Sequence, residues 1–106
     1  MTSTFDNCIL WNAILRNQNA YDDTDVMYLF MLQELDFQIV SSYYSRSEKI
    51  IQKMREMNVD NETSWTEIDT LYVNNIVEQI KEKNYNALVP KILSMLTTLE
   101  VHYGVN

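Results

Sequence analysis

The chain has 106 residues, with 15 acidic and 8 basic side chains and a net charge of −7. It contains one Gly, one Pro, one Cys and one His. Phosphate-binding loops, dinucleotide fingerprints and EF-hand loops need glycine at fixed offsets, and structural zinc sites need several Cys or His, so the composition excludes these classes. A hydrophobic share of 46% at this length predicts a single domain, residues 1–106, with its own core.

The composition also bears on the compartment. With Cys8 alone, no intrachain disulfide forms, and no run of about 18 apolar residues indicates a membrane span. The first six residues lack the positive charge and the apolar run of a signal peptide. We therefore expect an intracellular protein, cytoplasmic or nuclear (in the host cell if the gene is viral), that does not bind membranes.

The apolar spacing predicts an all-α fold, a four- or five-helix up-down bundle, since scarce Gly and Pro disfavour tight β-turns. The first helix is expected over residues 5–19, opened by a capping box of Ser3 and Asp6. A short strand at residues 8–11 is the alternative for this segment. The acid-rich break at residues 21–25 then supplies N-cap residues for the next helix.

A long segment follows, residues 26–57, without Gly or Pro. Apolar side chains recur along it at helical spacing: Leu32, Leu35, Ile39, Tyr43, Ile50, Met54 and Met57. One helix over about 25–57 would be roughly 50 Å long, too long for a compact domain whose radius of gyration is ~13 Å. We expect either a bend or break near residues 41–47, where serines cluster, or an elongated molecule that pairs with something.

A capping box also predicts the next helix. Ser64 and Glu67 have the spacing of an N-cap residue and its partner, so we expect Ser64 to be the N-cap. The core stripe of this helix is expected to contain Ile68, Leu71, Tyr72, Ile76, Val77 and Ile80. Lysines at positions 81 and 83 are typical of its C-terminal end.

The last helix is expected to begin at Asn86 or Val89, which is compatible with Pro90 in its first turn. Its apolar residues recur at helical spacing as far as Tyr103. Gly104 is expected to end it, because glycine favours the left-handed conformation of a helix C-cap.

Charge is unevenly distributed along the chain. Residues 46–57 carry four basic and two acidic side chains, whereas residues 1–45 have a net charge of −5 and residues 58–80 hold five acids and no base. On a helix, Arg46, Lys49 and Lys53 share one face. Such a patch suits an acidic protein partner; nucleic acid is not expected, because the overall charge repels phosphate.

No motif supplies catalytic equipment. The acid pairs Glu34 and Asp36, and Glu67 and Asp69, are two residues apart and so point to different helix faces. We therefore predict no catalytic residue, no metal and no cofactor, and a non-enzymatic protein–protein interaction module: an adaptor, inhibitor or assembly subunit that binds a protein partner or forms a homo-oligomer. The residues expected to bind the partner are Tyr43, Tyr44, Arg46, Lys49, Ile50, Lys53, Met54 and Met57.

Two alternatives stay open: an enzyme with a carboxylate-only site, and a viral or phage host-modulating protein, either Bcl-2-like or an acidic nucleic-acid mimic. Three segments, Ile9-Leu10-Trp11, Tyr21-Asp22-Asp23 and residues 32–36, resemble the start of the small Bcl-2-like immunomodulators of poxviruses. The uninterrupted stretch 26–57 departs from the several shorter helices of that family. The resemblance is the reason why a viral host-modulating protein stays among the alternatives.

Overall fold

The computed structural model describes residues 8–17, 21–22 and 36–105. Every regular element in these ranges is helical: α1 (Ile9–Arg16), α3 (Phe37–Glu56), α4 (Glu62–Ile68), η3 (Asp69–Val73), α5 (Asn74–Lys81) and α6 (Tyr85–Tyr103). The π-helical turn η3 joins α4 to α5 without a break, so these three form one helix. The described ranges thus contain four helices, and the all-α bundle expected from the sequence is confirmed.

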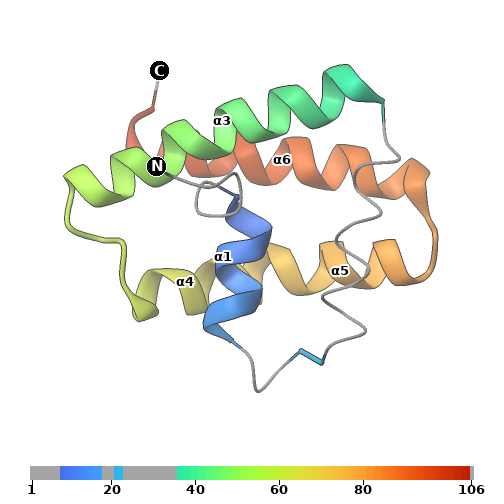
Figure 1. Ribbon diagram of the computed structural model, residues 1–106, viewed down its shortest axis with the longest axis horizontal. Coiled ribbons are helices and arrows are strands. Elements are labelled where there is room, and N and C mark those ends of the chain that lie inside the picture. The colour runs from blue at the N-terminus through green and yellow to red at the C-terminus, as the bar shows by residue number, and fades with distance from the viewer. Residues whose placement is uncertain (1–7, 18–20, 23–35, 106) are drawn as a thin grey trace.

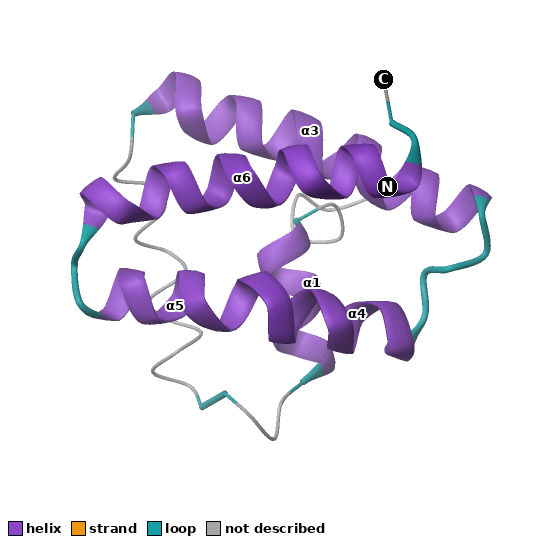
Figure 2. Cartoon of the chain, turned by 180° about the vertical axis from the view of Figure 1, so that it is seen from behind, coloured by secondary structure: helices purple, strands orange, loops and turns teal. Residues whose placement is uncertain are grey.

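Three of the helices follow one another in alternating directions: α3, the joined α4–α5 helix, and α6, which packs against both (Figures 1 and 2). The short helix α1 crosses this layer and contacts α3, α4 and η3. The core takes buried side chains from all four helices, among them Leu10, Ile50, Trp65 and Leu96. The radius of gyration is 12.9 Å, the value expected of a compact chain of this length.

The helix expected over residues 25–57 is shorter than predicted. The backbone of Asp36 is not helical (φ −51°, ψ 132°), and its side chain accepts a hydrogen bond from the Gln38 N–H at 2.9 Å, so Asp36 is the N-cap of α3. The helix then continues through residues 41–47, and the break expected there is wrong. Twenty residues span about 30 Å, which fits within the longest dimension of 35 Å. Residues 26–35 lie outside the described residues.

The first helix is confirmed from Ile9 onward, and the strand alternative for residues 8–11 is wrong. The expected capping box of Ser3 and Asp6 lies outside the described residues, as does most of the acid-rich break. Cys8 is the observed N-cap residue, and its side chain makes no capping hydrogen bond.

The neighbouring helix α3 caps α1 instead. The Ile9 N–H donates to Ser47 Oγ at 2.8 Å, and the Leu10 N–H donates to the Tyr43 hydroxyl at 3.0 Å. The first N–H groups of a helix have no partner within it, so two α3 side chains do what an N-cap side chain would do. Both acceptors are buried, and burial raises the pKa of Tyr43 well above its usual value, which keeps its hydroxyl protonated.

The next helix starts earlier than the sequence indicates. Asn61 is its N-cap and accepts a hydrogen bond from the Ser64 N–H at 2.9 Å, so the assignment of Ser64 as N-cap is wrong. The N-cap hydrogen bond is made by Asn61, three residues before the predicted N-cap Ser64. Asn is as good an N-cap residue as Ser.

The last helix is close to the prediction at both ends. It begins at Tyr85, which places Pro90 in the second turn rather than the first. Gly104 ends it as expected, with a φ of 70°. The backbone carbonyl of Glu100, in the last turn of α6, accepts a hydrogen bond from the Val105 N–H at 2.8 Å. This hydrogen bond is typical of helices that end at a glycine.

The π-helical turn has a cause in the sequence. The buried residues Trp65, Asp69, Val73 and Val77 recur every four positions. In an α-helix of 3.6 residues per turn such a repeat drifts by about 40° at each step. A π-turn contains one extra residue, so it brings Val73 and the residues after it back to the core face. It also leaves Leu71 on the surface, where the sequence predicted a core residue.

The hydrogen bond from Ile9 to Ser47 can be tested by mutation. Ser47→Ala leaves a buried N–H without its acceptor, so we expect a loss of about 1–3 kcal/mol in the free energy of unfolding. Urea unfolding measures it. Ser45→Ala is the matched control, because Ser45 is an exposed serine of the same helix and its replacement changes helix propensity equally. Equal effects of the two substitutions would contradict the capping role.

Candidate functional site

The α3 residues expected to bind a partner lie in different environments. The apolar anchors Ile50 and Met54 are 0% exposed, and Tyr43 is buried beside them. Tyr44 is half-buried against the same core, with its ring centroid 5.3 Å from that of Tyr43. The part of the apolar stripe from Tyr43 to Met54 is therefore covered within the fold, and Ile50 and Met54 are not available as anchors in this conformation.

Arg46, which was expected in the basic patch, connects α3 to α6. Its Nε donates to Glu100 Oε2 at 3.1 Å and its Nη2 to Glu100 Oε1 at 2.5 Å. A further hydrogen bond connects Arg46 Nη2 to Thr97 Oγ1 at 3.2 Å. The hydrogen bonds from Arg46 lower the pKa of Glu100 below its usual value. Arg46, a charged residue within the apolar stripe of α3, thus pairs with an acid of α6.

The remaining residues of the predicted patch are on the surface. Lys49 and Lys53 line an open hollow of about 270 Å³ between α3 and the end of α6, with Gln52, Glu56, Gly104 and Val105. Lys53 Nζ lies 3.8 Å from the Glu56 carboxylate, and Met57 is 47% exposed at the end of α3. Two lysines beside an acid are what remains of the basic patch.

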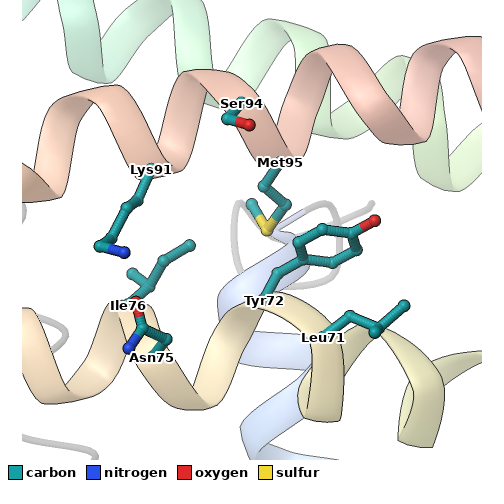
Figure 3. Close-up of a pocket in the computed structure, with 7 residues that line it drawn as sticks. All are labelled: Leu71, Tyr72, Asn75, Ile76, Lys91, Ser94 and Met95. Carbon is teal, nitrogen blue, oxygen red and sulfur yellow. The ribbon is translucent and has the colours of Figure 1, made fainter.

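A second surface was not expected from the sequence. A groove of about 170 Å³ runs between α6 and the joined α4–α5 helix (Figure 3). A smaller hollow of about 60 Å³ adjoins it. Leu71 and Tyr72 of η3 line both, and we call the two together the Leu71 groove. Its other lining residues are Glu67, Ile68, Asn75, Ile76, Lys91, Ser94, Met95, Thr98, Leu99, His102 and Tyr103.

The Leu71 groove combines an apolar centre with a polar rim. Leu71 is 57% exposed, and Tyr72 is half-buried beside it. Figure 3 shows the Tyr72 ring and Met95 pointing toward each other from the two helices, and Lys91 extending from α6 across the groove. Fully buried centres with aromatic residues and polar rims are typical of protein–protein interfaces. The four-residue spacing around Val73 was the sequence signal that could have placed Leu71 outside the core.

Asp60 connects three helices through its carboxylate, a role that was not predicted from the sequence. Its Oδ1 accepts hydrogen bonds from Trp65 Nε1 at 2.7 Å and from Arg16 at 3.2 Å, and its Oδ2 from Arg55 Nε at 3.3 Å. The Arg16 guanidinium also lies over the Trp65 ring, 5.7 Å from its centroid. One carboxylate in the loop before α4 therefore ties together α1, α3 and α4, which is a structural role.

Asp69 is a buried carboxyl at the start of η3. It is 8% exposed and accepts a hydrogen bond from the Tyr21 hydroxyl. Burial raises the pKa of Asp69, and the hydrogen bond from Tyr21 opposes this increase. Among the residues that the structure describes, no group of three or more His, Cys, Asp or Glu is placed to hold a metal ion.

Comparison with known proteins adds no assignment. No family model, curated protein or solved structure matches the chain. The resemblance to the Bcl-2-like immunomodulators therefore stays a prediction. None of the helices in the described ranges is long and apolar enough to cross a membrane.

The burial of Asp69 gives a pH-dependent prediction. A raised folded-state pKa contributes stability that is fully present below the pKa of the unfolded chain and lost as pH rises through the folded pKa. The stability of the wild type relative to Asp69→Asn should therefore increase as pH falls from 7 to about 4. Urea unfolding of both proteins at each pH measures this difference. A constant difference, or one that moves the other way, contradicts the assigned cause.

Proposed function

We propose that this chain is a non-enzymatic protein–protein interaction module that binds its partner through the Leu71 groove. The observation that supports the proposal is the exposure of Leu71 beside Tyr72, between two helices that are otherwise packed together. A leucine on a helix surface needs no explanation by itself. Here it borders a hollow lined by Tyr72, Asn75, Lys91 and Ser94, where a partner side chain would meet both apolar and polar atoms.

The strength expected of such a contact favours the groove over the surface of α3. Burying one large apolar side chain contributes about 1.5–3 kcal/mol, and a few central residues supply most of the affinity of an interface. Leu71 and Tyr72 would be such central residues. On α3, Ile50 and Met54 are already in the core. The exposed apolar side chains there are Phe37 (82%) and Met57 (47%), at opposite ends of the helix, and neither lines the hollow beside Lys49 and Lys53.

The proposal covers the roles of adaptor, inhibitor and assembly subunit, and it would also serve a host-modulating protein, because each acts by docking. The alternative of a carboxylate-only enzyme would be built on Asp69, whose pKa is raised by burial. Its hydrogen-bond partner, the Tyr21 hydroxyl, occupies one carboxylate oxygen. We prefer the docking role because the groove offers a surface that a partner can reach.

A photo-reactive amino acid at position 71 tests the proposal in the cells that make the protein. Light should join this position to a second polypeptide, whereas the same amino acid at position 57 should give little or no product. Met57 is a matched control, since it is an apolar side chain of similar exposure at the far end of the α3 surface. Products from position 57 alone, or from neither position, would overturn the proposal.

A further inference from the structure

We infer that the Leu71 groove binds a second copy of this chain, in a symmetric dimer. The inference rests on the proposed function and names its partner. It comes from the distribution of charge around the groove, in which one end carries an acid and the other a base.

Glu67 and His102 line the hollow at one end of the groove, and Asn75 and Lys91 line it at the other. Leu71 and Tyr72 lie between them, since they line both hollows. Glu67 and Lys91 therefore lie at opposite ends of the groove, with the pair Leu71 and Tyr72 between them.

This arrangement is complementary to itself. A two-fold axis through the centre of the groove places Leu71 and Tyr72 of the two copies against each other. The same rotation brings Glu67 of each copy to Lys91 of the other, because a two-fold interface pairs residue i with j and j with i. Each Glu67 then faces a Lys91 of the other copy at both ends, and neither Glu67 nor Lys91 faces its own counterpart. A parallel arrangement of the two grooves would place Glu67 against Glu67.

The other surface does not have this property. The hollow beside Lys49 and Lys53 carries both bases and Glu56 on one helix, and its far side is formed by Gly104 and Val105. Glu56 lies at the opposite end of this hollow from Lys49, but no exposed large apolar side chain lines the space between them.

Reversing the charges tests the pairing. Glu67→Lys and Lys91→Glu should each weaken dimerisation by about tenfold or more, because each places like charges at both ends of the interface. The double variant exchanges the two charges and should restore the dimer to near wild-type affinity. Light scattering on the purified full-length chain, over a dilution series, measures all four proteins.

Two further variants control for folding and location. Leu71→Asp should give a monomer whose circular dichroism and melting temperature stay close to those of the wild type, since residue 71 is exposed. Met57→Asp should leave the dimer unchanged. If a charge reversal fails to fold, Glu67→Gln and Lys91→Gln replace it, and each should weaken the dimer without loss of helicity.

The outcomes separate this inference from the proposed function. A wild-type chain that stays monomeric up to its solubility limit, or a double variant that does not recover, overturns the symmetric dimer. In cells, a cross-linked product from position 71 at twice the mass of the chain supports the dimer. A product with another protein overturns the dimer and keeps the proposed function, and the absence of any product overturns both.

Discussion

The contact between the start of α1 and the middle of α3 is the interaction on which the rest of the structure depends. Helix α1 begins inside the core, where water cannot satisfy its first N–H groups, and each such group left unpaired would cost about 1–3 kcal/mol. Ser47 and Tyr43 accept two of them. The Tyr43 hydroxyl is also within 3.0 Å of Cys8 Sγ, so the whole start of α1 is joined to one face of α3.

This contact holds α1 across one face of the layer formed by the other helices. Helix α1 contacts α3, α4 and η3, and the α3 side chains Ile50, Ile51 and Met54 are buried in the same core. Asp60 holds the far end of α1 through Arg16. Helix α6 packs on the other side of α3, where Arg46 binds Glu100. The face formed by η3 and α6, directed at the reader in Figure 2, is left with Leu71 exposed.

The sequence predicts what local chemistry decides. Gly104 ends α6 because glycine adopts a positive φ without strain, and the apolar periodicity identifies the helical class. Ser47 shows where local reasoning fails: serines near it were expected to break the helix, yet it accepts a hydrogen bond from another helix 38 residues away in sequence. Arg46 is similar, since its acid is 54 residues away. Such pairings depend on which helices become neighbours, and spacing within one helix does not reveal that.

The candidate site was missed for a related reason. The expected stripe assumed a regular helix through residues 68–80, which placed Leu71 inside. The π-turn changes the phase of the helix at Asp69–Val73 and moves Leu71 to the surface. The π-turn accommodates a four-residue repeat of buried side chains that includes Asp69 and Val73. The repeat is difficult to recognise in the sequence because an aspartate is not expected in a core.

An NMR dilution series tests most directly which surface this chain uses. The methyl signals of Leu71 and the ring signals of Tyr72 should shift with protein concentration, while the methyl signal of Met57 should stay constant. Leu71 and Met57 are both exposed side chains, so each responds to a partner that covers it. If the Met57 signal moves and the Leu71 signals do not, binding occurs at the α3 surface and the Leu71 groove is not the interface.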